Sequence, residues 1–222
     1  MNYLTGIALS QNAFALIALM AGDMPGMVEA GRIAAEVGEQ AEEQLMVYAG
    51  LGFQAWAESR LGQYAAADAH WARQQEVARH LGAQIGIADW FMAASAEMAL
   101  AQGRVEDARA LAEQTVATAA MIGGVFSAGL AQRVWGAALA ASTPPRWDEA
   151  EAHMAESVRA FESGAAHLEA PHTHLAWGRL CLDRDDHVCA HDHLRQAATR
   201  FEAAGLTTEL DQTRTLLARL RA

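Results

Sequence analysis

The sequence predicts an all-α fold, built as a solenoid of helical hairpins. Alanine is the commonest residue in the chain, a composition that favours helix. A turn motif recurs along the whole sequence at an almost constant interval, and a separate series of glycines recurs with the same period. Because one helical hairpin cannot bury its own apolar face, hairpins of this kind stack on their neighbours into a continuous core.

The turn motif is followed by a bulky residue and, three positions later, usually by alanine. It opens with glycine in three copies and with proline or aspartate in the other two. The bulky positions are evenly spaced, at Met24, Tyr64, Val105, Trp147 and His187. The alanines that follow four of them, at positions 67, 108, 150 and 190, are small enough to let paired helices approach closely.

The second series consists of glycines that end the next segment of each repeat. Their spacing matches that of the turn motif, at Gly38, Gly82, Gly123, Gly164 and Gly205. Glycine adopts the left-handed conformation that commonly ends a helix. Each of the five is therefore predicted to be a helix C-cap.

The segments between these anchors are alanine-rich and long enough for several helical turns, and each is expected to be a helix. The expected hairpins cover 3–37, 41–81, 84–121, 124–163 and 168–204. A last helix over 208–221 is expected to close the array, because Thr208-x-x-Asp211 is a capping-box pattern and arginines follow near its C-terminal end. These elements together make residues 1–222 a single domain.

The second hairpin resembles the tetratricopeptide (TPR) family. That family places a small residue in the first helix, Gly-x-Tyr-x-x-Ala at the turn and a bulky residue four positions later. The close matches here are Ala55, Gly62, Tyr64, Ala67 and Trp71. The copy at Gly103 matches more loosely, and the copy at His187 lacks the glycine and the tyrosine.

The period of this chain, near 41, exceeds the family's usual length of about 34 residues. Long repeats of this kind resemble the C-terminal repeat regions of bacterial signalling ATPases, maltose-activator-like regulators and nucleotide-cyclase-linked proteins. The resemblance covers the whole chain and implies a right-handed superhelix of about five hairpins plus a capping helix. An armadillo- or HEAT-like array shares the period and is the alternative fold, but it lacks the Gly-x-Tyr-x-x-Ala turn.

The resemblance also implies a function: a non-enzymatic scaffold in bacterial signalling or transcriptional regulation. In the family, the first helix of each pair lines a concave groove that binds a peptide or protein. Carried over by register, the groove residues are Asn12, Leu16, Gly52, Trp56, Arg60, Trp90, Ala93, Glu97, Arg133, His172 and Arg179. A small-molecule sensor with its ligand in this Trp/Arg groove is the alternative function, and burial of Trp56 and Trp90 in the core is the alternative role for those residues.

The N-terminal segment 1–22 contains no charged side chain. A helix that is apolar on all sides is normally buried, whereas a terminal repeat needs a polar outer face. We therefore expect a face of this helix to meet a second copy, an upstream domain or another protein, through Leu4, Ile7, Phe14, Ile17 and Leu19. The alternative is that the helix folds back onto the groove. The absence of a basic n-region argues against a signal peptide, and the longest uninterrupted apolar run, 13–21, is too short to span a bilayer.

Histidines and both cysteines gather near the C-terminus. Helical spacing allows four of them to converge on a zinc ion between two paired helices: His174, Cys181, His187 and His191. His187 and His191 share one face of their helix, and Cys189 and His193 lie on nearly the opposite face. The favoured alternative is that these residues are core positions of the repeat, so no metal or cofactor is predicted.

Charge and motif content exclude further function classes. The net charge is −11 and every one of the 16 basic residues is arginine, so no basic stripe is available to bind nucleic acid. No set of residues pairs a nucleophile with a base, so an enzyme is not expected. Two cysteines are too few for a disulfide scaffold, which favours a cytoplasmic protein without membrane partners.

Overall fold

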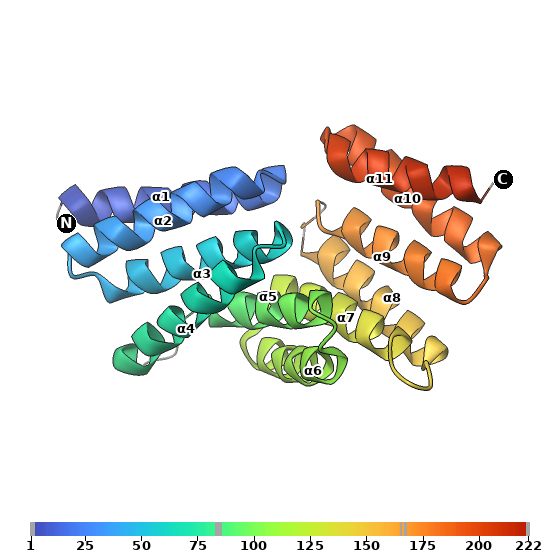
Figure 1. Cartoon of the computed structure of the whole chain (residues 1–222), viewed down its shortest axis with the longest axis horizontal. Helices are drawn as coiled ribbons and strands as arrows, with labels where there is room; N and C mark the ends of the chain where they lie inside the picture. Colours follow the sequence, from blue (N-terminus) through green and yellow to red (C-terminus); the bar gives the residue numbers. More distant parts are fainter. Residues whose placement is uncertain (1–2, 83–85, 165, 167, 221–222) are drawn as a thin grey trace. The chain divides into compact units, whose positions relative to one another are not determined.

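The structure is a computed structural model that describes residues 3–82, 86–164, 166 and 168–220. Within these ranges the chain is all-helical, with eleven α-helices and no strand, as the sequence predicts (Figure 1). The first six helices are α1 (Tyr3–Ala21), α2 (Met24–Gln40), α3 (Gln44–Arg60), α4 (Tyr64–Leu81), α5 (Ala88–Ala101) and α6 (Val105–Ile122). The remaining five are α7 (Val125–Ala140), α8 (Trp147–Ser163), α9 (Ala170–Asp183), α10 (His187–Ala204) and α11 (Thr207–Arg219).

Left-handed residues end several of the helices. Gly82, Gly123 and Gly205 are the C-caps of α4, α6 and α10, with φ of 59°, 74° and 73°. At this backbone angle a side chain would be strained, so glycine stops the helix without cost. The predicted C-caps are confirmed at these three positions.

Of the other two predicted C-caps, Gly38 is wrong, and Gly164 is right in position but not in its left-handed conformation. Gly38 lies inside α2, which continues to Gln40, and the left-handed residue that follows is Glu42, with φ of 59°. Gly38 serves packing instead, because a Cβ there would lie 3.0 Å from the backbone nitrogen of Val47. Gly164 does cap α8, but its φ is −85°, outside the left-handed region.

The chain divides into two compact units, Met1–Phe91 and Met92–Ala222. In unit 1, α2 packs against both α1 and α3, and α3 packs against α4. In unit 2, α7 packs against α6 and α8, and α10 packs against α9 and α11. Consecutive helices therefore form most of the contacts within each unit, as Figure 1 shows, and α1 also contacts α3 and α7 also contacts α9.

Small residues lie at the close approaches between helices. Ala67, Ala108, Ala150 and Ala190 have no exposed surface, so the alanines that follow each turn are core residues, as expected. α3 is the most deeply buried helix in unit 1, since every residue from Val47 to Ser59 is buried. Its glycines allow the contact: a Cβ on Gly50 would lie 2.7 Å from the nitrogen of Ala35.

The closing helix starts one position earlier than predicted, and a different interaction fixes its start. The N-cap of α11 is Leu206, which makes no side-chain capping bond, so the predicted capping box at Thr208 is not used. Leu206 and Leu210 are instead buried together against Phe201 and Leu194 of α10. Apolar packing therefore fixes the start of α11.

Candidate functional site

The helix α1 carries the largest group of exposed apolar side chains on one element. Its side chains at Tyr3, Phe14 and Ile17 are 80%, 55% and 61% exposed, and Leu9 is 48% exposed. Positions 3, 14 and 17 fall within about 60° of one another around a helix of 3.6 residues per turn. We call Tyr3, Phe14 and Ile17, with Leu9 at the margin, the α1 apolar face.

The opposite side of α1 holds the helix to the rest of unit 1. Ala8, Asn12, Ala15 and Leu19 are buried, three or four positions apart along the helix. The Asn12 amide donates to the carbonyl oxygen of Met46 at 3.2 Å, and the Thr5 hydroxyl donates to Glu43 at 3.3 Å. The helix therefore has a defined inner side and a free outer side.

Only part of the predicted N-terminal interface is exposed in the structure. Phe14 and Ile17 are exposed as expected, and Leu4 and Ile7 are half-buried. Leu19 is 4% exposed, on the inner side, so it is a core residue and cannot meet an outside partner. Tyr3 and Leu9, which were not among the predicted residues, replace it on the outer side.

By length and composition α1 could also cross a membrane, since its 19 residues have a mean hydropathy of 1.6. About a quarter of that stretch, 28%, is buried inside the protein. The uninterrupted apolar run 13–21 is too short to span a bilayer, but the whole helix is long and apolar enough to do so. The buried line from Ala8 to Leu19 gives α1 a protein contact along one full side.

The predicted groove residues of unit 1 do not form an open groove. Trp56 is fully buried and Asn12 is 8% exposed with its amide already bonded, so both belong to the core. Arg60 is half-buried and lies over the Trp56 ring, 5.1 Å from its centroid. Leu16 and Trp90 are half-buried. The structure therefore joins Trp56 and Arg60 in a cation–π contact that faces inward.

In unit 2 the predicted groove residues Glu97 and Arg133 meet, but as parts of a buried ion cluster. The Arg133 guanidinium lies 2.9 Å from the Glu169 carboxylate and 3.3 Å from that of Glu97. Its side chain is 8% exposed and lies 5.8 Å above the ring of Phe161. We call Glu97, Arg133 and Glu169 the buried ion cluster. Because Arg133 already bonds two carboxylates, it is not free to bind a ligand.

The last two predicted groove residues contact the closing helix. His172 is half-buried, with its ring edge against Phe201 at 5.0 Å and its Nε2 3.9 Å from Glu209. Arg179 is exposed, and its guanidinium donates to Gln212 at 3.5 Å. Arg179 is thus the one exposed member of the predicted groove set. Gly52 and Ala93 are buried.

The four weak candidates for a zinc site do not converge, because α10 presents its other flank to α9. His174 meets His193, with the two Nδ1 atoms 3.1 Å apart, and His193 stacks on Trp177 at 4.0 Å. His187 is exposed, and His191 is half-buried beside a polar surface hollow. Among the described residues, no group of three metal-ligating side chains includes His174, His187 or His191.

Burial controls the protonation of the His174–His193 pair. It lowers the pKa of His174 to about 4, and the positive charge of Arg200 acts in the same direction. Burial also lowers the pKa of His193. In the 3.1 Å contact one Nδ1 must donate and the other accept, so the two rings cannot both be protonated in this arrangement.

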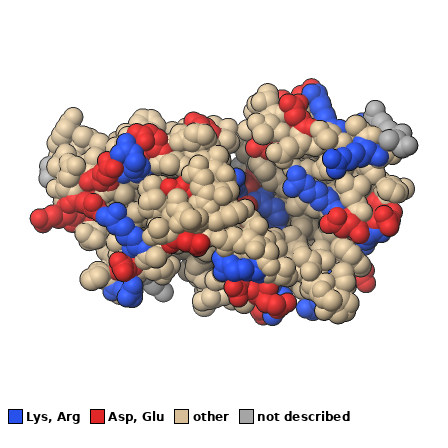
Figure 2. Space-filling model, viewed as in Figure 1, with Lys and Arg blue, Asp and Glu red and all other residues tan. Residues whose placement is uncertain are grey.

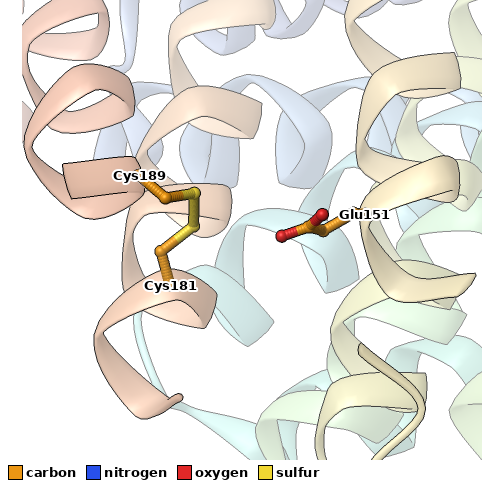
Figure 3. A group of neighbouring side chains, drawn as sticks. All are labelled: Glu151, Cys181 and Cys189. Carbon is orange, nitrogen blue, oxygen red and sulfur yellow. A yellow bond between two sulfur atoms is a disulfide. The ribbon is translucent and has the colours of Figure 1, made fainter. Parts of the chain in front are cut away.

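Cys181 is not a free thiol in the structure, since it forms a disulfide with Cys189 across the turn between α9 and α10. Helical spacing placed Cys189 on the face away from the zinc candidates, and the pairing was therefore not predicted. The carboxylate of Glu151, on α8, points toward this disulfide (Figure 3).

The hollow beside His191 has a volume of about 420 Å³. It is lined from one helix only, by His191, Asp192, Arg195, Gln196, Thr199 and Arg200. Acidic and basic side chains are interspersed over the face drawn in Figure 2. A hollow with open sides and mixed charge on a single helix lacks the enclosure of a ligand site.

No known protein family has a model that matches this chain, and no curated protein matches it in sequence.

The residues that sequence reasoning missed are Glu151, Glu169, Cys189 and His193. Each is a polar or sulfur-bearing residue whose partner comes from another helix. Glu169 had a detectable signal, since it directly precedes Ala170-Pro171 at the expected start of a helix, where an acidic residue is favourable. Cys189 and His193 depended on which flank of α10 faces α9, and Glu151 depended on how α8 packs against α9. Spacing within one helix determines neither.

Proposed function

We propose that the protein is a non-enzymatic, TPR-like scaffold that binds a protein partner through the α1 apolar face. In this proposal the helical hairpins form a superhelix of about five repeats closed by α11, and the setting is bacterial signalling or transcriptional regulation. The setting rests on the resemblance of the repeats alone.

A single observation carries the proposal. Phe14 and Ile17 lie one turn apart on the outer side of a helix that has no charged side chain, and each is more than half exposed. A contiguous exposed apolar patch is typical of a protein–protein or membrane contact, whereas single exposed apolar residues are ordinary. Tyr3 is exposed on the same side of α1 about three turns away, and tyrosine is enriched where binding energy concentrates.

A protein partner fits this surface better than a lipid bilayer. Helices that lie in a membrane interface are typically rich in lysine and arginine on the polar side, and α1 has neither acidic nor basic residues in its terminal turns. Its inner side is tied to the rest of unit 1 by the Asn12–Met46 hydrogen bond and by buried alanines. A partner that covers only the outer side leaves these contacts intact.

The residues of the predicted Trp/Arg groove do not support a small-molecule sensor. Trp56 is buried, and Arg133 is held by two carboxylates, so neither side chain is free to contact a ligand. No observation on the described residues therefore favours the sensor as a second function.

The experiment compares the wild-type chain with a variant carrying both Phe14→Glu and Ile17→Glu. Met121→Glu is the matched control, because Met121 is 79% exposed and belongs to a different helix, α6 of unit 2. Sedimentation over a wide concentration range measures self-association. A photoreactive amino acid at position 9 in each chain, irradiated in an extract of the source cells, captures a different protein, which mass spectrometry identifies.

We expect either a concentration-dependent dimer or one cross-linked protein with the wild type and the Met121→Glu control. Both should be lost when Phe14 and Ile17 become glutamate. A wild-type chain that stays monomeric and cross-links to no protein would contradict the proposal. So would binding to lipid vesicles that the double substitution abolishes while no protein is captured.

A further inference from the structure

Three metal-ligating side chains from three consecutive helices converge in unit 2. They are Glu151 of α8, Cys181 of α9 and Cys189 of α10, and their ligand atoms all lie within 4.8 Å of one another (Figure 3). In the structure the two sulfurs are joined as a disulfide. We propose that this cluster binds one zinc ion when the disulfide is reduced.

The donor set suits zinc. Thiolates select soft or borderline metals such as zinc, and a carboxylate oxygen is an accepted third ligand. With bonds of about 2.3 Å to sulfur and roughly 2.0–2.2 Å to oxygen, two ligands of a tetrahedral zinc lie roughly 3.3–3.8 Å apart. The Cα atoms of Cys181 and Cys189 are 5.8 Å apart, so opening the disulfide to this spacing requires side-chain movement only.

The turn before α10 holds Cys189 in place. Asp186 caps the helix by accepting the backbone N–H of Cys189 at 3.0 Å, which fixes the first turn of α10. The positive end of the helix dipole favours the thiolate form of a cysteine in this turn. The ligand position at Cys189 is therefore set by the backbone and does not depend on whether the disulfide is closed.

Arg184 supplies the compensating charge. Its guanidinium lies 2.8 Å from one oxygen of Glu151 and 2.9 Å from Asp186. Two thiolates, one carboxylate and a zinc ion together carry one negative charge, and the guanidinium, which Asp186 shares, offsets part of it. Because a carboxylate has two oxygens, Glu151 can bond Arg184 with one and the metal with the other, and Arg184 then acts as a positioning residue for Glu151.

The site has a route for the metal to enter. Cys181 is fully buried, while Cys189 is partly exposed and the Glu151 side chain is 28% exposed. Zinc would thus reach the two sulfurs from the side of Cys189 and Glu151. Three protein ligands leave a fourth tetrahedral position for water or for a ligand from another molecule.

The redox step balances with an external thiol as reductant. Two molecules of a monothiol, such as the glutathione class, deliver two electrons and two protons to the Cys181–Cys189 disulfide and become one disulfide themselves. Zinc binding then releases the protons of the two new thiols into solvent. Oxidation reverses both steps, so metal binding reports the redox state of the cysteine pair.

The test measures zinc binding by calorimetry and by native mass spectrometry on the whole chain. Zinc is added to the chain reduced with a phosphine that is then removed, and to the oxidised chain. The variants are Glu151→Gln and Cys189→Ser, neither fully buried. The control is Glu156→Gln, on the same helix but exposed and paired with Arg159. Circular dichroism checks that each variant folds.

We expect one zinc per reduced chain, none on the oxidised chain, at least tenfold weaker binding for Glu151→Gln and no change for Glu156→Gln. Cys189→Ser should lose binding. The comparison of reduced with oxidised wild type needs no substitution, so a variant that fails to fold leaves the test intact. Equal binding in both redox states, no stoichiometric binding at all, or loss of binding in His191→Ala but not in Glu151→Gln would each overturn the proposal.

Discussion

At the scale of single residues, burial separates two kinds of ion pair. Arg32 bonds Glu29 and Glu36 on the surface of α2, with its side chain 43% exposed. Arg133 bonds Glu97 and Glu169 with its side chain 8% exposed. Exposed pairs contribute little to stability, but removing one partner of a buried pair leaves an uncompensated charge. Substituting each arginine in turn therefore compares what a buried and an exposed ion pair contribute to stability.

We expect Arg133→Met to lower the free energy of unfolding by about 3–5 kcal/mol, because the buried Glu169 carboxylate loses its countercharge. Arg32→Met should cost less than about 1 kcal/mol, since solvent screens its partners. Urea denaturation of both variants at pH 7 measures the difference. Similar losses in the two variants would contradict a structural role for the buried ion cluster.

At the scale of elements, two glycines inside helices have opposite roles. Gly52 of α3 faces the packed interior, where a Cβ would lie 2.3 Å from Gln74 Nε2 and 2.5 Å from Phe91 Cζ. Phe91 cannot move aside easily, since its ring makes edge contacts with Tyr48, Phe53 and Trp71. Gly6 of α1 has nothing within 4 Å of the same position.

We expect Gly52→Ala to destabilise the protein by about 2 kcal/mol, because the added methyl forces the packed rings or the buried Gln74 amide to shift. Gly6→Ala should instead stabilise it by about 0.5–1 kcal/mol, because alanine is the better helix former and meets open space. Thermal unfolding of the two variants gives the sign directly. A loss of stability in Gly6→Ala would show that the outer side of α1 is occupied in solution.

The helices were predictable to the extent that their ends carry local signals. Glycine readily adopts the left-handed conformation that ends a helix, so three helix ends could be predicted, at Gly82, Gly123 and Gly205. The start of α11 carries no such local signal. Its N-cap, Leu206, is positioned by packing against Phe201 and not by a capping side chain. Local chemistry thus fixes these three boundaries, and tertiary packing fixes the start of α11.

The candidate site was less predictable, because it depends on how helices turn toward one another. In α1 no charged residue distinguishes the inner side from the outer, so Leu19 could not be separated from Ile17 by composition. In α10, histidines lie on both sides of the row of buried residues. Only the packing against α9 determines that His193 and Cys189, rather than His187 and His191, pair with residues of α9. These orientations arise from pairs of helices, and a pattern within one helix does not contain them.

At the scale of the whole molecule, net charge and histidine burial act in opposite directions as the pH falls. The chain carries a formal charge of −11 at pH 7, so gaining protons at first reduces repulsion among its acidic groups. Burial lowers the pKa of His153, His174 and His193, so the folded protein resists protonation at these positions. As the pH falls, the unfolded chain therefore binds more protons at these positions than the folded chain does. By linkage, the free energy of unfolding decreases as the pH falls.

The pH window follows from His174, whose pKa drops from 6.5 to about 4 on folding. Its contribution is fully present above pH 6.5 and is lost as the pH falls toward 4. We expect the wild type to lose about 1–2 kcal/mol of unfolding free energy between pH 7 and pH 5 through this residue, a range in which most carboxylates stay ionised. The groups that face it are His193, Arg200, Glu162 and Asp192.

His174→Phe tests this directly, because phenylalanine fills a similar volume beside His193 without a titrating nitrogen. Urea denaturation at pH 7, 6 and 5 should show a shallower loss of stability for this variant than for the wild type. His187→Phe is the control, since His187 is exposed on the same hairpin and should leave the slope unchanged. If His174→Phe kept the full wild-type slope, the acid sensitivity would have to come from His153 or His193, whose pKa values burial also lowers, and His174 would be a packing residue alone.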